Sequence, residues 1–200
     1  MKHIIIFFAI ISLAFSLQAQ EGSYMERLQK YQAEQNAEFA DSSASPLTAE
    51  DRATFEALDF YPIDSTFCVQ ARFVRTEGSK PFEMKTTTAR KPVYEKYGEA
   101  HFVINGDSLM LTLYQSHRSM NHPIYKDYLF LPYTDSTSGD ESYGGGRFID
   151  VRIPEGDTIE IDFNKSYNPY CAYNHKYSCP VPPSENYLDV AVRAGVKKYH

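Results

Sequence analysis

Apolar and polar residues alternate with a period of two along much of the chain after residue 65. In residues 65–76, Phe67, Val69 and Phe73 share one face, and Gln70 lies on the other. This is the period of a β-strand with one buried face. The other segments that read as strands are 82–88, 93–116, 125–135, 147–154 and 157–164, with 188–199 as a further candidate.

Residues 93–116 form the clearest predicted hairpin, because Asn105-Gly106 in the middle of the segment supplies the positive φ angles of a tight turn. Pro132 and Pro154 predict breaks or sheet edges, since proline cannot donate a ladder hydrogen bond.

The region before residue 60 has helical periodicity instead. In residues 23–41, Leu28 and Tyr31 fall on one face, and Ser23 is a candidate N-cap. The apolar stripe is thin, so we expect this helix to lie on the surface of the main body. A second, short helix follows, with Thr48 as its N-cap and acidic residues in its first turn.

Seven or eight short strands preceded by one or two helices indicate a mainly β fold. The expected architecture is an antiparallel sandwich or a partly closed barrel. The predicted organisation is a signal peptide in residues 1–19, a helical segment in 20–58 that packs on the main domain, and a β-rich domain in 59–200.

The first residues have the composition of a secretory signal peptide. Lys2 supplies the positively charged n-region, and residues 4–15 are almost wholly apolar. Ala19 is a small residue of the kind found at signal-peptide cleavage sites. The apolar stretch is short for a membrane span, although an N-terminal anchor is the alternative. We therefore expect an exported protein, periplasmic or extracellular, without stable membrane insertion once the signal is removed.

The net charge of −6 is dispersed along the chain. A mildly acidic protein lacks the basic face that nucleic acid requires, and it is also poorly suited to anionic membrane surfaces. The chain contains 16 Tyr and no Trp, a composition that suits β-structure, interfaces and sugar-like ligands. The oligomeric state cannot be predicted from these features.

Three consecutive glycines, 144–146, precede the predicted strand that begins at Arg147. Such a run lets a backbone approach a partner closely, and its N–H groups can form an anion-binding nest. No Lys-Ser/Thr and no helix follows, so the run is not a P-loop. A flexible turn that leads into the strand is the simpler interpretation.

The stretch DFNKSYNPYCAYNHKYSCPVPPSENYL, residues 162–188, is too irregular for a strand or a long helix. A long ordered loop of this kind is usually functional or covalently restrained. In an oxidising compartment, Cys171 and Cys179 can form a disulfide, which would stabilise the fold by roughly 2–3 kcal/mol in the chain-entropy model. Two buried free thiols are the alternative.

A zinc site at Cys171, His175 and Cys179 is the third possibility, and it is disfavoured. These residues supply three ligands, whereas a structural zinc requires four, and exported thiolates tend to oxidise. No metal or other cofactor is otherwise indicated. The motifs of common hydrolases, metalloproteases and nucleotide-binding folds are missing from the sequence.

Two further groups of polar residues stand out. His117 and His122 lie five residues apart, and no carboxylate accompanies them at a regular spacing. Such histidines are more typical of the surface than of a polar functional site. Asp150 and Asp162 lie on neighbouring predicted strands and can pair as two carboxylates. Ion pairing with nearby arginines, or exposure to solvent, is the simpler role for both.

The segments SYGGGRFIDVRIP and IDFNKSYNPYCAYNHKYSCPVPPSENYLDVAVRAG resemble the signature of the DUF1684 family, a bacterial and archaeal family of unknown function. The resemblance extends from Asp59 to Gly195 and implies a shared fold without a known reaction or ligand. The positions that match are Tyr143 to Arg147, Asp162, Asn164, Tyr167, Asn168, Cys171, Cys179, Pro182, Pro183, Glu185 and Asn186. His175 falls in a variable segment of that signature.

Three functions are compatible with these features. The favoured one is a small-molecule-binding module with its site near the glycine turn and the irregular loop. The candidate ligand-binding residues are Tyr143, Gly145, Arg147, Asp162, Asn164, Asn168, Glu185 and Asn186. The first alternative is a hydrolase in which Asp162, Glu185 or Asp150 is the base and Arg147 with Asn164 holds an anionic group. The second is a structural loop without a ligand.

Overall fold

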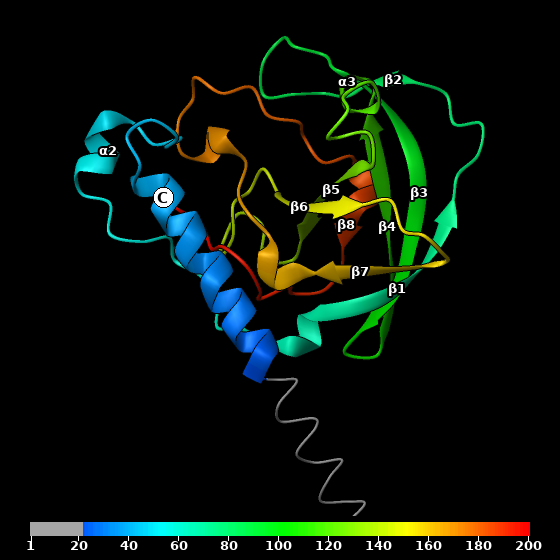
Figure 1. Cartoon of the computed structure of the whole chain (residues 1–200), viewed down its shortest axis with the longest axis horizontal. Coiled ribbons are helices and arrows are strands. Elements are labelled where there is room, and N and C mark those ends of the chain that lie inside the picture. Colours follow the sequence, from blue (N-terminus) through cyan, green and yellow to red (C-terminus); the bar gives the residue numbers. More distant parts are fainter. Residues whose placement is uncertain (1–21) are drawn as a thin grey trace, which may run out of the picture.

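The computed structural model describes residues 22–200. The expected signal peptide, residues 1–19, lies outside the described residues. Within 22–200, none of the helices combines the length and the apolar character needed to cross a bilayer. The described chain is built around one curled β-sheet, with a helix packed beside it (Figure 1).

The strands run in the order β6-β5-β4-β3-β1-β7, and β2 and β8 are attached to β3 and β5. Their bounds are β1 (Cys68–Arg75), β2 (Phe82–Glu83), β3 (Val93–Ile104), β4 (Asp107–Ser116), β5 (Tyr128–Asp135), β6 (Arg147–Arg152), β7 (Thr158–Asp162) and β8 (Tyr187–Leu188). All pairs are antiparallel except β5 with β8. The sheet curls into a half-barrel that stays open between β6 and β7, which confirms the prediction of a mainly β, partly closed barrel (Figure 1).

The predicted hairpin of β3 and β4 is confirmed. Asn105 and Gly106 both have positive φ, at 53° and 92°, and the ladder begins beside them with Ile104 opposite Asp107. Only these turn residues separate the two long strands, so the turn chemistry fixes their register.

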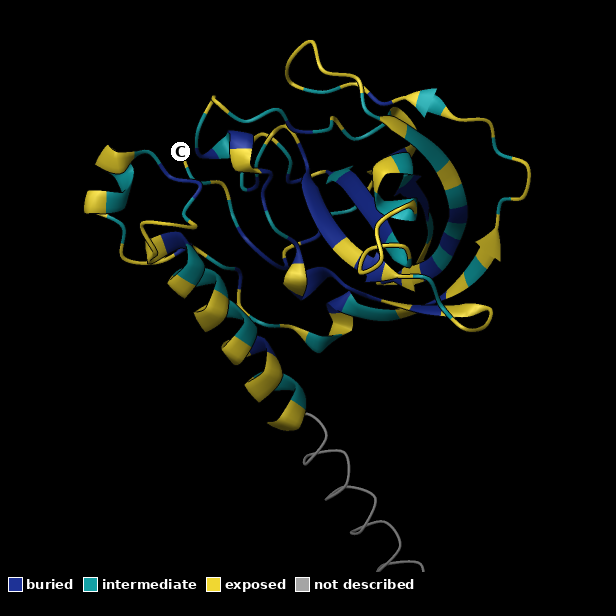
Figure 2. Cartoon of the chain, turned by 45° about the horizontal axis from the view of Figure 1, so that its top comes forward, coloured by how far each residue is buried: buried dark blue, intermediate teal, exposed yellow. Residues whose placement is uncertain are grey.

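The two faces of the sheet carry different clusters. Along β5, Leu129 and Leu131 belong to the main core inside the curl, whereas Phe130 packs on the outer face. There its ring meets that of Phe148 edge to face, with centroids 4.7 Å apart. Buried residues line the inside of the curl in Figure 2. The outer face of β5 and of β6 around Phe148 is therefore apolar as well, and the loop from residue 166 to 183 covers it.

Pro132 lies inside β5 and not at a break, contrary to the sequence prediction. The β4–β5 ladder has a single pair, Tyr114 opposite Phe130, and continuing its register places Thr112 opposite Pro132. Proline has no N–H for this position. The side chain of Asn186 takes its place, because its amide bonds both the N–H and the carbonyl of Thr112 and the carbonyl of Pro132.

The predicted N-terminal helix spans residues 22–40. Ser23 lies inside it, so the predicted N-cap is wrong, and the Ser23 hydroxyl instead accepts a hydrogen bond from Arg27. In Figure 2 the helix is exposed on one side. The second helix, α2 (Ala49–Ala53), is capped as predicted, because Thr48 Oγ1 accepts from the Asp51 N–H at 3.1 Å.

The remaining helical segments are single turns: α3 (His117–Met120), η1 (Ser65–Phe67), η2 (Phe163–Lys165), η3 (Tyr170–Ala172) and η4 (Ser184–Asn186). The strand predicted at 188–199 is wrong. Beyond Leu188, which belongs to β8, the segment makes one isolated bridge, Val196 with Phe60. Scattered backbone hydrogen bonds and the side chain of Arg147 hold it in place without a continuous ladder. Of the predicted strand 82–88, only Phe82–Glu83 pairs with β3.

Candidate functional site

Arg147, at the start of β6, is completely buried. Its guanidinium donates to the carbonyls of Ala194 and Val192, at 2.5 and 2.8 Å, and to Asp135 Oδ1 at 3.2 Å. The ring of Tyr133 lies 5.3 Å away. Arg147 thus fastens the C-terminal segment to the sheet, and it lines none of the cavities described below. This position does not support the predicted role of Arg147 in holding an anionic group of a ligand.

Asp162 and Asn164 join the end of β7 to the N-terminal part of the chain. Asp162 Oδ1 accepts from the Tyr24 hydroxyl at 3.0 Å and from the Asn164 backbone N–H at 3.1 Å. The Asn164 side chain bonds both backbone groups of Asp64. Lys165 Nζ lies 3.7 Å from Asp162 Oδ2. These groups bond to the protein itself, as the structural hypothesis expects.

The other predicted polar residues are similarly engaged. Asn168 Nδ2 donates to the carbonyl of Lys197 at 2.9 Å, and Asn186 fills the gap between β4 and β5. Glu185 accepts from the Tyr114 hydroxyl at 3.0 Å and pairs with Lys96 at 2.8 Å. Arg147, Asp162 and Glu185, on which the hydrolase hypothesis depends, thus belong to three separate sets of contacts.

The glycine run forms a tight turn. The Gly146 N–H donates to the Tyr143 carbonyl at 3.0 Å, so it is not free for an anion nest. Gly146 has a φ of +83°, and a Cβ there would lie 2.6 Å from Pro182 Cγ and from the Tyr133 carbonyl. A Cβ at Gly145 would meet the Tyr143 ring. The run therefore lets the turn pack against the proline-rich end of the loop.

Cys171 and Cys179 lie side by side as free thiols in this structure, and their disulfide stays a prediction. The Cys171 N–H donates to Cys179 Sγ at 3.2 Å, and the Tyr143 hydroxyl lies 4.0 Å from Cys171 Sγ. The hydrogen bond from the Cys179 thiol lowers the pKa of Cys171 to about 6, and the same contact raises the pKa of Cys179. Within residues 22–200, no three His, Cys, Asp or Glu side chains gather as a metal site would require.

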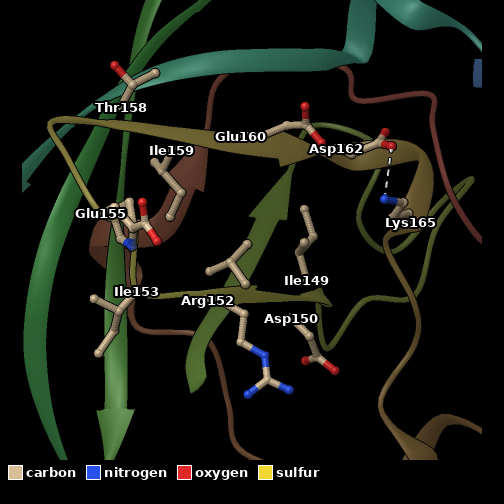
Figure 3. Close-up of a pocket in the computed structure, with 12 residues that line it drawn as sticks. Ile149, Asp150, Arg152, Ile153, Glu155, Thr158, Ile159, Glu160, Asp162 and Lys165 are labelled. Carbon is tan, nitrogen blue, oxygen red and sulfur yellow. Dashed lines mark ion pairs between the residues drawn. The ribbon is translucent and has the colours of Figure 1, made fainter. Parts of the chain in front are cut away.

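The opening between β6 and β7 contains a cavity of about 430 Å³ (Figure 3). Its floor is apolar, and charged residues of both strands surround it. Asp150 and Asp162 lie on its two sides, and in Figure 3 their carboxylates point away from one another. The two carboxylates therefore do not pair in this structure.

Two further cavities contain predicted residues. Tyr143, Gly144, Cys171 and His175 help to line one of about 550 Å³ beside the C-terminal residues. Glu185 lines another, of about 400 Å³, beside β2. The predicted ligand-binding residues that line a cavity are thus spread over three separate ones, and the structure does not bring them together.

A fourth cavity, of about 300 Å³, lies on the outer face of β5 and β6 under the irregular loop. We call it the aromatic pocket. Its lining residues are Tyr94, Tyr128, Phe130, Phe148, Tyr167, Pro169, Tyr170, Tyr177, Ser178, Cys179 and Pro180. The strands supply four of the rings and the loop supplies three. This is the concave, mostly apolar type of site in which proteins bind small molecules.

Asp150 lies beside this pocket on the same face of β6. Its Oδ1 accepts from the hydroxyls of Tyr128 and Tyr167, at 2.5 and 2.6 Å. Burial, together with the Asp150 charge, raises the pKa of both phenols, so they remain neutral donors. An oriented carboxylate, which also lines the opening between β6 and β7, thus lies next to the aromatic walls of the pocket.

Sequence reasoning missed most of the lining residues, because it treated Phe130 and Phe148 as ordinary strand residues. One signal was available. In the run YLFLPY of β5, both faces are apolar, which is typical of a strand covered on both sides. Tyr167 was noted only as part of the loop signature, and Cys179 only as a partner of Cys171 or a zinc ligand.

The family model described as "Protein of unknown function (DUF1684)" matches residues 53–197. The chain also resembles the solution NMR structure of an uncharacterized protein from gene locus rrnAC0354 of Haloarcula marismortui. The TM-score is 0.67 at 30% identity, over 89% of this chain and 96% of that one. No curated protein matches the chain.

Proposed function

Since the chain belongs to the DUF1684 family, whose function is unknown, we propose its role from the site itself: a small-molecule-binding module that uses the aromatic pocket. The observation that carries this proposal is the meeting of aromatic side chains from β3, β5, β6 and the loop around one cavity of about 300 Å³. That volume is at the lower end of the range, about 300–1,000 Å³, that is typical of ligand pockets.

The pocket is held in shape by backbone contacts, which favours binding without a large ordering cost. Phe148 and Tyr167 exchange two backbone hydrogen bonds, at 2.9 and 3.0 Å. Farther along the loop, Thr87 bonds Cys179 twice, through its N–H and its hydroxyl. Both ends of the loop segment over the pocket are therefore fixed.

The alternatives are less well supported. The hydrolase requires Arg147, Asp162 and Glu185 to share a site, and their contacts are separate. The structural hypothesis accounts for Asn164, Asn168 and Asn186, which bond to main chain, but it leaves the aromatic pocket without a role. In our proposal the domain is exported, so its ligand is met outside the cytoplasm.

Ligand-observed NMR with a library of small fragments tests the proposal. The matched variants are Tyr177→Ala, which removes one wall of the pocket, and Tyr187→Ala, which removes an exposed tyrosine of β8. We expect hits for the wild type and for Tyr187→Ala that weaken or disappear in Tyr177→Ala. A wild-type protein that binds no fragment, or hits unaffected by Tyr177→Ala, would overturn it.

A further inference from the structure

Asp150 gives the aromatic pocket a charge preference that the proposed function does not specify. We infer that the ligand is a small organic cation, such as a substituted ammonium, and that the Asp150 carboxylate recognises its charge. This inference rests on the aromatic pocket being the binding site.

The Asp150 carboxylate is held in one orientation, and only one of its two oxygens accepts hydrogen bonds. Its Oδ1 accepts from Tyr128 and Tyr167. Within residues 22–200, Oδ2 has no hydrogen-bond partner. Two phenols fix the direction of the side chain, so the second oxygen is available for a donor or a positive charge at the edge of the pocket.

No cation of the described chain neutralises Asp150. Arg152, the next residue on the same face, pairs with Asp127 at 2.8 Å and also donates to the Ile124 carbonyl. Lys165 lies near Asp162 instead. A negative charge therefore stands beside the aromatic rings without an internal partner, and a cationic ligand complements it.

The rings strengthen this preference. Aromatic faces attract cations through the negative charge above the ring, and the recognition of quaternary ammonium groups by aromatic cages uses this effect. A neutral phenol that donates a hydrogen bond to a carboxylate gains electron density in its ring, because hydrogen-bonded groups polarise one another. Tyr128 and Tyr167 both donate in this way.

Three cations contact lining residues, and they restrict where a bound cation can lie. The Arg90 guanidinium donates to the Ser178 carbonyl at 2.6 Å, and Lys176 Nζ lies 4.9 Å from the centre of the Tyr177 ring. The Arg152 guanidinium, which pairs with Asp127, lies 6.0 Å from the centre of the Tyr128 ring. Each repels a second positive charge nearby. We therefore expect the ligand's charged group beside Asp150, with its apolar part toward Phe130 and Phe148.

Choline and its neutral isostere 3,3-dimethylbutan-1-ol test the inference, since they have nearly the same shape and differ in charge. Both are titrated by NMR into the wild type, Asp150→Asn and the control Asp107→Asn, an exposed residue at the start of β4. Asp150→Asn keeps an oxygen that can accept from the two phenols.

We expect choline to bind the wild type about tenfold more tightly than the alcohol, a ratio within the usual range for cation–π and exposed carboxylate contacts. Asp150→Asn should remove this ratio and Asp107→Asn should preserve it. Equal affinities in the wild type, a ratio unchanged by Asp150→Asn, or no binding of choline would overturn the inference. Fragment hits that depend on Tyr177 would then still support the proposed function, whereas their absence would remove both.

Discussion

The side chain of Asn186 lies between β4 and β5 where Pro132 has no N–H to donate. Its Oδ1 accepts from the Thr112 N–H at 2.9 Å, and its Nδ2 donates to the carbonyls of Thr112 and Pro132 at 2.8 and 2.7 Å. One primary amide thus satisfies three buried backbone groups. A residue that resembled a ligand contact in the sequence is part of the sheet.

Asn186→Ala should therefore be strongly destabilising. Three buried backbone groups lose their partner, and each unsatisfied group costs about 1–3 kcal/mol, partly offset if water enters. We expect a loss of about 3 kcal/mol in the free energy of unfolding, measured by urea denaturation. The control Asn121→Ala, at an exposed site, should have little effect. Equal midpoints for the two variants would show that Asn186 does not hold the strands.

Arg147 also has a structural role, because it pairs with a buried charge. Truncating it to Ala leaves Asp135 charged and fully buried, which typically costs about 3–5 kcal/mol. The control is Arg193→Ala, because Arg193 pairs with Glu141 at 2.6 Å with more than half of its side chain exposed. We expect a large fall in the urea midpoint for Arg147→Ala and almost none for Arg193→Ala. Similar midpoints would contradict a structural role for Arg147.

At the scale of elements, the N-terminal helix and the irregular loop hold one another. The Tyr24 hydroxyl donates to Asp162, Tyr31 donates to the Lys165 carbonyl, and Tyr170 of the loop donates to Glu38 of the helix. The helix lies outside the residues that the family model matches, which begin at 53. Its tyrosines nevertheless fasten it to the family's signature segment.

Tyr24→Phe tests this docking. The change removes the hydroxyl that donates to the buried Asp162 and accepts from Asn164 Nδ2 at 3.0 Å. We expect a loss of about 1–3 kcal/mol of stability, because a carboxylate with little access to water loses a donor. Tyr31→Phe, with an exposed hydrogen bond, is the matched control and should cost less. Tyr31→Phe costing as much as Tyr24→Phe would argue against the role of the buried contact.

The cysteine pair of the loop gives a pH prediction. Because the pKa of Cys171 is lowered to about 6, its thiol ionises as the pH rises through that value, and the thiolate is the nucleophile. The rate at which iodoacetamide alkylates Cys171, measured by peptide mass spectrometry, should therefore rise near pH 6 and come close to its maximum by neutral pH. The protein is kept reduced, because the predicted disulfide would block the reaction.

Cys68 is the internal control for this experiment. Burial raises the pKa of Cys68 to about 11, so it should stay unreactive at neutral pH. The contact with Cys171 also raises the pKa of Cys179, which should react later than Cys171. Faster labelling of Cys68 or Cys179, or a Cys171 profile centred near the ordinary thiol value of about 8.5, would contradict the assigned contact.

For the whole molecule, local chemistry made much of the fold predictable. The Asn105-Gly106 turn, the Thr48 cap and the alternation along β1 each depend on neighbours in sequence. The C-terminal segment was wrongly predicted as a strand because its backbone is held by Arg147, which is more than 40 residues away along the chain. A contact between residues so far apart in the sequence cannot be detected from the pattern of neighbouring residues.

The candidate site was less predictable for a related reason. Polar residues of the signature, such as Arg147 and Asn186, suggested a ligand site, yet they satisfy buried backbone and charge. The pocket instead collects aromatic residues that are far apart in sequence and individually ordinary, such as Tyr94 and Tyr177. Only the curl of the sheet and the path of the loop bring them together.

The position of a bound fragment in a crystal of the protein tests most directly whether the aromatic pocket is the binding site. We expect a fragment in the aromatic pocket, between the Phe130–Phe148 pair and Tyr177, with its polar or charged end at Asp150. A fragment that binds instead in the opening between β6 and β7, or beside Tyr143, with the aromatic pocket empty, would contradict it.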